Sequence, residues 1–189
     1  MNKDDRRAKK TERALKEALT KLLCEKELKD ITVKELTDTA DIHRATFYTH
    51  YEDIYDLYNK IEGSVLDELS ALIISDPTHS YETLFTTLFE YLYDNLQVCS
   101  MLLGDKNHRS FTDRICNMLK EKYIEISRYE ISSKEIPEIW NVLIEYHIRG
   151  YVSMIALLIK ENKLPEMQEL IQLFYRMDCR FDAILEEYR

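Results

Sequence analysis

The sequence contains few of the residues that interrupt helices, with only three glycines and three prolines among 189 residues. Straight-chain residues that suit helices, such as leucine, lysine and glutamate, are abundant. It contains no internal repeat, no low-complexity tract and no strand pattern of any length. We therefore expect an all-α protein with about nine helices in one or two small domains.

Long apolar segments are also missing. No run approaches the about 18 residues of a membrane span, and the charged amino terminus lacks the apolar region of a signal peptide. These absences predict a cytoplasmic protein without a membrane partner.

The sequence also lacks the spacings that mark metal and catalytic sites. None of the four cysteines, Cys24, Cys99, Cys116 and Cys179, belongs to a C-x-x-C pair, so no zinc site is expected. Buried, reduced thiols are the simpler interpretation, and a redox sensor is the alternative. The five histidines have no recurring serine, cysteine or carboxylate around them, and no glycine-rich phosphate loop occurs. We expect no enzyme activity, no metal and no cofactor.

The charge is distributed unevenly along the chain. The net charge is -9 overall, yet residues 1–16 carry +4, residues 1–50 carry +2 and the remainder carries -11. A weakly basic head on an acidic body suits a protein that presents one end to phosphates. For any single lysine near the amino terminus, an ordinary solvated helix face is the alternative.

The pattern of the first fifty residues predicts three helices. Apolar residues at helical spacing indicate a helix over residues 8–26. Thr32 and Glu35 then form a T-x-x-E capping box at the start of a short second helix. A tight turn separates it from a third helix over about 43–50, which carries small, cationic, hydroxyl and aromatic residues. This is the construction of a helix-turn-helix, whose second helix enters the DNA major groove.

Helical patterns continue through the rest of the chain. Asp53 is the expected N-cap of a long helix that stops near residue 76. Five further segments are predicted to be helical: 80–96, 97–104, 108–129, a helix running to about 161, and 166–187.

The head resembles the DNA-binding domain of the TetR/AcrR family of transcriptional regulators over residues 11–57. The resemblance is carried by Ile31-Thr32-Val33, Leu36, Ala40, Ile42, Arg44, Thr46-Phe47-Tyr48, His50-Tyr51, Asp53 and Asp56-Leu57. The core T-F-Y-x-H-[FY] is specific, because generic helix-turn-helix proteins lack it. The resemblance implies a DNA-binding domain over residues 1–52 and a helical regulatory and dimerisation domain over residues 53–189.

The family resemblance also implies roles for single residues. It places base-edge contacts at Arg44, Ala45 and Thr46. The remaining implied DNA-binding residues, several of them expected at phosphates, are Thr32, His43, Tyr48, Thr49 and His50. Phe47 is expected in the core.

Three positions depart from the family pattern. His43 stands where the family usually has a serine or asparagine N-cap, which makes the cap poorer but adds a possible cation. Asp41 replaces the usual turn glycine and is expected to tolerate a left-handed conformation. Ile54 replaces a lysine that commonly contacts phosphate, which should weaken nonspecific affinity for DNA.

In the body, the resemblance implies a small-molecule effector and a dimer interface. The candidate pocket residues are Phe89, Tyr93, Met118, Tyr123, Trp140 and Tyr146. Ordinary core is the favoured explanation of aromatic residues at helical spacing, because no convergent polar group identifies a ligand. The candidate interface residues, on the last two helices, are Tyr146, Gly150, Met154, Leu157, Leu173, Met177 and Phe181.

The sequence thus favours a ligand-responsive repressor that binds a palindromic DNA operator as a homodimer. The alternative is a coactivator or interaction protein of the same fold that binds DNA weakly or not at all, and an enzyme is the least supported class.

Overall fold

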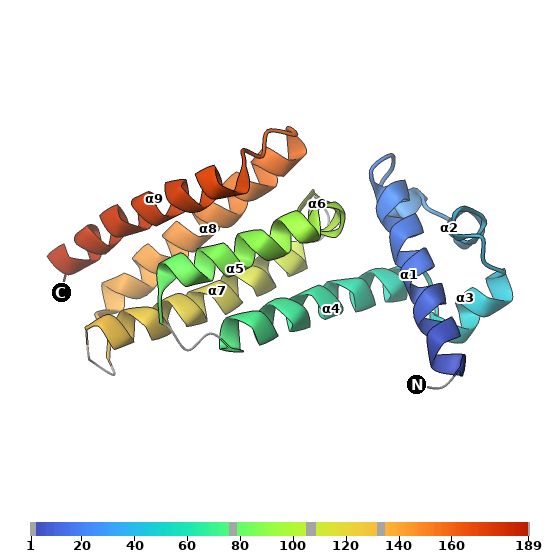
Figure 1. The fold of residues 1–189 in the computed structure, drawn as a ribbon, viewed down its shortest axis with the longest axis horizontal. Coiled ribbons are helices and arrows are strands. Elements are labelled where there is room, and N and C mark those ends of the chain that lie inside the picture. The colour runs from blue at the N-terminus through green and yellow to red at the C-terminus, as the bar shows by residue number, and fades with distance from the viewer. Residues whose placement is uncertain (1–2, 76–78, 105–108, 132–134, 189) are drawn as a thin grey trace. The chain divides into compact units, whose positions relative to one another are not determined.

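The computed structural model describes residues 3–75, 79–104, 109–131 and 135–188. Within these ranges it contains nine α-helices, one short 3₁₀-helix and no strand (Figure 1), which confirms the predicted all-α fold. The helices are α1 (Lys3–Leu23), α2 (Val33–Ala40), α3 (Arg44–His50), α4 (Ile54–Ser75), α5 (Tyr81–Asp94), α6 (Leu96–Gly104), α7 (Arg109–Glu130), α8 (Glu138–Lys160) and α9 (Met167–Glu187). The 3₁₀-helix covers Leu28–Asp30.

The chain separates into two compact units, Met1–Val65 and Leu66–Arg189. The division falls inside α4, because the first three turns of this helix bury Leu57, Tyr58 and Ile61 in the first unit. The functional boundary between residues 52 and 53 stays a prediction.

The first unit is a small helical head. α1 packs on α2, and α2 packs on α3. The completely buried side chains of Leu15, Leu19, Leu36 and Phe47 come from all three helices and form its core. Because α3 has only seven residues, it is too short to be stable alone and depends on this packing.

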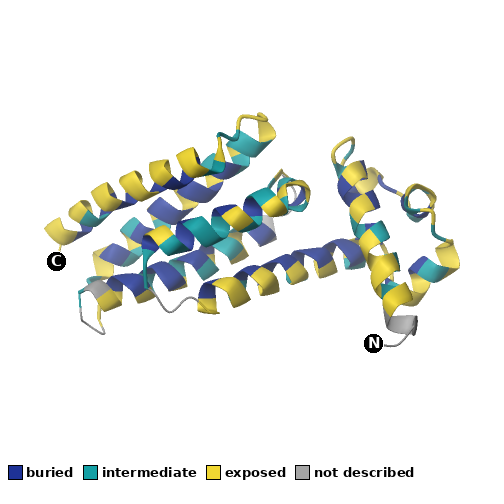
Figure 2. Cartoon of the chain, in the orientation of Figure 1, coloured by how far each residue is buried: buried dark blue, intermediate teal, exposed yellow. Residues whose placement is uncertain are grey.

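The second unit is a bundle in which α5 packs on α9 and α7 packs on α8. Its core combines aromatic and aliphatic residues from these four helices with residues of α4 and α6. Figure 2 shows buried positions along one side of α9 and exposed positions along the other. By its length and composition alone, α8 is long and apolar enough to cross a membrane. Six of its apolar residues, together with His147, are buried in the bundle.

A buried polar network joins three helices of this bundle. The Asp178 side chain of α9 is 1 % exposed, and its Oδ1 atom accepts a hydrogen bond from the Tyr123 hydroxyl of α7 at 2.6 Å. The same oxygen lies 3.1 Å from Nε2 of His147 on α8. The His147 ring stacks on Phe181 with centroids 3.8 Å apart. Burial, followed by the nearby Asp178 charge, raises the pKa of Tyr123 far above its usual range, so this phenol remains a donor.

The expectation for the cysteines was only partly correct. All four are free; Cys99 and Cys116 are buried, whereas Cys24 and Cys179 are exposed. Cys24 follows the last residue of α1, and Cys179 lies on the outward side of α9, so neither meets the core.

Candidate nucleic-acid interface

α2 begins with half of the predicted capping box. The Thr32 side chain accepts a hydrogen bond from the Glu35 backbone N–H at 3.2 Å, as an N-cap should. The Glu35 carboxylate instead pairs with Lys26 Nζ at 2.6 Å. This ion pair connects the loop after α1 to the first turn of α2. Glu35 therefore bonds Lys26 in place of the backbone N–H of Thr32, which is an exposed residue.

The turn after α2 has the conformation expected from its sequence. Asp41 adopts φ 55° and ψ 46°, the left-handed region that glycine usually occupies. The Ile42 backbone N–H donates to the Thr37 carbonyl at 3.0 Å, which closes the end of α2. Asp41 therefore performs the role of the family's turn glycine at some cost in strain.

α3 separates core residues from exposed ones along its length. Phe47 is completely buried and its ring meets that of Tyr51 at 5.6 Å between centroids. Arg44, Ala45, Tyr48 and Thr49 are exposed. The exposed side thus carries the types of residue that read base edges and contact phosphates.

The beginning of α3 has no side-chain cap. His43 occupies the N-cap position with extended backbone, but its imidazole makes no capping hydrogen bond. Within the described part of the chain, Arg44 has no ion-pair partner. Two exposed side chains, His43 and Arg44, therefore extend from the open helix start, where backbone N–H groups also favour an anion.

The start of α4 is built around carboxylates and a lysine. Asp53 caps the helix by accepting from the Asp56 N–H at 2.8 Å. Ile54 is 5 % exposed and belongs to the core, so position 54, where the resemblance leads us to expect a lysine, faces inward here. Lys60 Nζ donates to the His50 carbonyl at 3.0 Å and to Asp56 Oδ2 at 3.0 Å. The bond from Lys60 lowers the pKa of Asp56.

Sequence reasoning missed a basic groove between α1 and α4. The groove has a volume of about 450 Å³ and is lined by four cationic residues, Lys9, Arg13, Lys16 and Lys60, together with one acidic residue, Glu12. It reaches the end of α3, because Lys60 donates to His50. The signal in the sequence was the spacing of Lys9, Arg13 and Lys16, which places them on one side of α1.

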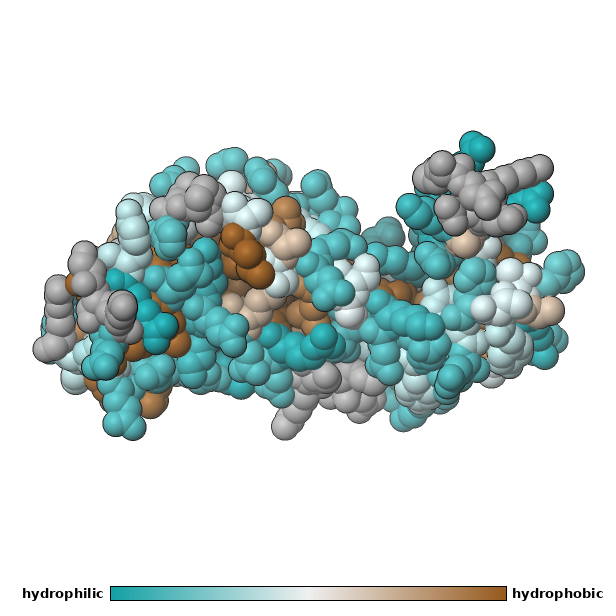
Figure 3. All heavy atoms as spheres, turned by 90° about the horizontal axis from the view of Figure 1, so that it is seen from below, coloured by the Kyte–Doolittle hydropathy of each residue, from teal (hydrophilic) through white to brown (hydrophobic). Residues whose placement is uncertain are grey.

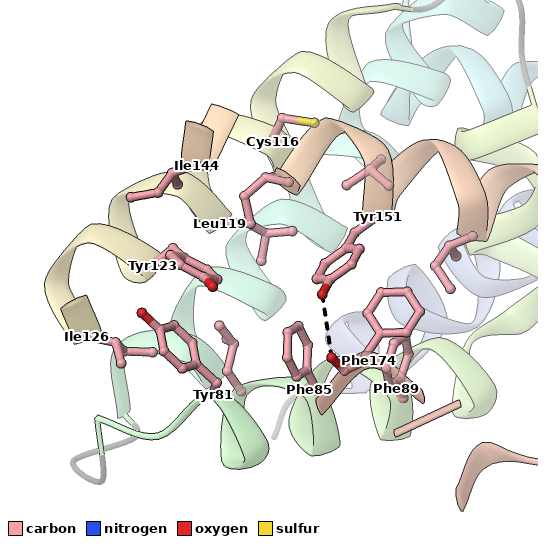
Figure 4. Packing of buried hydrophobic residues seen from close by; sticks show 14 of the residues in the cluster. Tyr81, Phe85, Phe89, Cys116, Leu119, Tyr123, Ile126, Ile144, Tyr151 and Phe174 are labelled. Atoms are coloured by element: carbon pink, nitrogen blue, oxygen red, sulfur yellow. Dashed lines mark hydrogen bonds between the residues drawn. The ribbon is translucent and has the colours of Figure 1, made fainter. Parts of the chain in front are cut away.

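The second unit contains an apolar cavity of about 100 Å³ that is partly open to solvent. Its lining comes from α4 to α9 and includes Phe85, Phe89, Leu119, Tyr151 and Phe174. Figure 4 shows these side chains converging between the helices, with the Tyr151 hydroxyl donating to the Phe174 carbonyl at 3.4 Å. An apolar cavity of this kind can hold a small apolar molecule.

Comparison of the sequence with protein-family models and with curated proteins gives no match. Comparison with solved structures gives several similar folds. One is an activator of a dihydroxyacetone kinase operon, 18 % identical with a TM-score of 0.66, covering 93 % of this chain and 96 % of that one. A TetR transcriptional regulator from Streptococcus agalactiae is 21 % identical with a TM-score of 0.64, covering 92 % and 96 %. A fatty acid degradation regulator from Bacillus halodurans is 11 % identical with a TM-score of 0.67, covering 88 % and 93 %.

The chain has the TetR-type fold. In this fold α2 and α3 form the helix-turn-helix that the sequence predicted, and Thr32, His43, Arg44, Ala45, Tyr48 and Thr49 are all exposed on it. Thr46 and His50 are half-buried. The hydroxyl of Thr49 donates to the Thr46 carbonyl at 2.6 Å, so it would have to turn outward to meet a phosphate.

Most of the residues predicted for a pocket of this TetR-type fold do not line the cavity. Phe89 does. Tyr123 belongs to the Asp178 network, and Tyr93 donates to the Pro165 carbonyl. Trp140 is buried outside the cavity, Met118 is half-buried outside it, and Tyr146 is 78 % exposed and points away from the core. Apolar residues occupy both sides of α8, so helical spacing did not separate inward from outward positions.

The residues predicted for the dimer interface are mostly exposed. Tyr146, Gly150 and Leu157 are exposed on α8, with Met154 half-buried beside them, while Leu173 and Met177 are exposed on α9. Phe181 is the exception, because it is 7 % exposed and packs on His147 in the core. Figure 3 shows that apolar residues also reach one surface of the second unit between hydrophilic ones.

Proposed function

We propose that this protein is a DNA-binding transcriptional regulator that binds a palindromic operator as a homodimer. The observation that carries the proposal is the exposed side of α3, where Arg44, Ala45 and Tyr48 are presented by a helix whose Phe47 is locked in the core. Arg44 pairs with guanine in this proposal, and Ala45 contacts a thymine methyl group.

Phosphate contacts come from both sides of this helix. Thr32, Tyr48 and His50 serve as contacts along the groove wall, with Thr49 and His43 beside them. The basic groove supplies further charge through Lys9, Lys16 and Lys60, which compensates for the inward-facing Ile54. Because neutralised phosphates release counterions, binding falls steeply with salt.

The dimer forms through α8 and α9 in this proposal. Eight large apolar residues on these helices are at least 38 % exposed: Ile139, Val142, Tyr146, Leu157, Leu173, Tyr175, Met177 and Ile184. A second copy of the chain covers this surface and places two α3 helices on half-sites about one helical turn, or roughly 34 Å, apart. We further propose that the protein acts in the cytoplasm as a ligand-responsive repressor and has no enzyme activity.

The test is a gel-shift titration with the DNA upstream of the protein's own gene. Arg44→Ala should weaken binding by about 5- to 150-fold for each half-site, because a bidentate arginine–guanine contact contributes about 1–3 kcal/mol. Arg128→Ala is the matched control, since Arg128 is exposed on α7 in the second unit and should leave the affinity unchanged. Unchanged binding by Arg44→Ala, with wild-type protein that shifts the fragment, would remove Arg44 from the interface.

A coactivator that works through another regulator is the second candidate. Two observations favour it: the exposed acidic residues Glu52 and Asp53 lie beside α3, and Ile54 is buried where the family has a lysine. One of the similar structures is also an activator. Absence of any shift at about 50 mM salt, where electrostatic binding is strongest, would support this candidate over the repressor.

A further inference from the structure

The cavity of the second unit has a wall that is suited to uncharged molecules. No charged side chain among the described residues lines it, and two of its polar groups are the phenols of Tyr91 and Tyr151. The Tyr151 hydroxyl donates to the Phe174 carbonyl at 3.4 Å, and the Tyr91 hydroxyl donates to Glu68 Oε2 at 2.8 Å. Burial raises the pKa of both phenols, so both remain protonated donors to these acceptors.

A carboxylate in this cavity would therefore find no cation in the described part of its wall. Removing an ionised group from water without a partner is strongly unfavourable, whereas an apolar molecule gains from the same transfer. The volume of about 100 Å³ is somewhat below that of engineered apolar cavities of about 150 Å³ that bind benzene. A small aromatic molecule therefore enters with a modest outward movement of the wall.

One side of the wall belongs to α4 and its partners. Leu69 of α4 lines the cavity directly, and its neighbour Glu68 accepts the hydrogen bond from Tyr91 of α5. Tyr91 is half-buried, unlike Phe85 and Phe174, which are in the core. The Tyr91 ring thus lines the cavity, while its hydroxyl is hydrogen-bonded to Glu68 of α4. The same α4 contributes residues Ile54–Val65 to the first unit.

We propose that this cavity binds a small uncharged apolar molecule, and that Tyr91 transmits its presence to α4 through the hydrogen bond with Glu68. The proposal deepens the proposed ligand response and rests on it for its biological purpose. A ligand that displaces the Tyr91 ring lengthens or breaks the bond to Glu68 and changes the restraint on α4. The experiments below use no DNA, so their failure is distinguishable from failure of DNA binding.

The ligand class is tested by thermal unfolding with benzene and with benzoate as matched probes. At ten times its Kd, benzene should raise the melting temperature by about 3–6 °C, and benzoate at the same concentration should not. Leu88→Phe, which adds volume at the cavity wall, should abolish the benzene shift. Leu158→Phe is the control, because Leu158 is half-buried on α8 outside the wall. Equal shifts by benzoate, or a full benzene shift in Leu88→Phe, would overturn the assignment.

The transmission step is tested by hydrogen exchange of the α4 segment covering residues 66–75. In the wild-type chain, benzene should change the exchange of this segment at least twofold. Tyr91→Phe keeps the ring but removes the bond to Glu68, so it should bind benzene and lose most of the change in α4. Tyr151→Phe, whose hydroxyl meets α9 instead, should keep the change. A normal α4 response in Tyr91→Phe, or loss of benzene binding by it, contradicts this role for Tyr91.

Discussion

Replacing Asp178 by alanine is expected to destabilise the second unit strongly. Asp178 is 1 % exposed, and a single oxygen, Oδ1, accepts from Tyr123 on α7 and lies within hydrogen-bond distance of His147 on α8. Removing the carboxylate leaves both partners buried without this acceptor. These donors gave up their hydrogen bonds to water when the chain folded, and in the variant no protein acceptor replaces them. This unrepaid desolvation is the larger part of the cost.

The size of the effect follows from the two bonds. Each of the two buried groups left without its acceptor costs about 1–3 kcal/mol. The Tyr123 hydroxyl is also 3.5 Å from Asp182 Oδ1, which is a weak alternative acceptor. We therefore expect Asp178→Ala to lower the free energy of unfolding by about 3–4 kcal/mol.

Asp178→Asn distinguishes the acceptor from the charge. Asparagine keeps an oxygen at the position of Oδ1 and can still accept from Tyr123, while it loses the charge that faces His147. Its expected cost is about 1–2 kcal/mol, roughly half that of alanine. Equal costs for the two variants would show that the charge, not the position of the acceptor, stabilises the network.

Urea unfolding followed by tryptophan fluorescence is the suitable assay. Trp140 is the sole tryptophan, lies on α8 and is 2 % exposed, so its emission reports unfolding of this unit. All variants are compared at one protein concentration, because the proposed dimerisation would make stability depend on concentration. Asp67→Ala, at an exposed position of α4, is the control and should stay within about 0.5 kcal/mol of wild type. Wild-type stability of Asp178→Ala would refute the reasoning.

Two further outcomes follow from exposed positions. Asp41→Gly should stabilise the first unit by up to about 1 kcal/mol, because glycine adopts the observed φ of 55° without strain. Chemical unfolding measures this change, and a loss of stability would show that the Asp41 side chain makes a stabilising contact. Tyr146→Asp should shift the sedimentation mass from dimer to monomer, because it places an unpaired charge in the proposed interface. The chain should stay folded, since this side chain is 78 % exposed on α8. A dimer of unchanged affinity would place the interface elsewhere.

The helices were predictable because their signals are local. The helices were located from the spacing of apolar residues, from capping residues and from the shortage of glycine and proline. The start of α1 differs most from its prediction, because this helix begins at Lys3 instead of residue 8. Asp41 and Asp53 were also read correctly, since each acts on its own turn or the next. Long-range pairs were not predictable in this way. His147 and Asp178 are 31 residues apart, and only the packing of α8 on α9 brings them together.

The candidate sites also differ in whether local or long-range interactions build them. The exposed side of α3 follows from a motif contained in twenty residues, so every residue predicted there lies on that helix or at the caps of α2 and α3. The cavity depends on which side of each helix faces inward. Trp140 and Tyr146 are six residues apart on the same apolar helix, yet one is buried and the other exposed. Lys60 was missed because its partner, the His50 carbonyl, is a backbone atom that no sequence pattern displays.

The two sides of the cavity differ in how firmly they are held. On the side of α8 and α9, Tyr151 packs between His147 and Phe174, with ring centroids 4.2 Å and 4.3 Å away, and the His147–Asp178 pair joins the two helices below it. On the side of α4 and α5, the solvent-exposed bond from Tyr91 to Glu68 connects the helices. A buried, charge-assisted network resists displacement more than an exposed hydrogen bond does. A molecule larger than the cavity should therefore displace the α4 side first, while the proposed dimer surface on α8 and α9 keeps its shape.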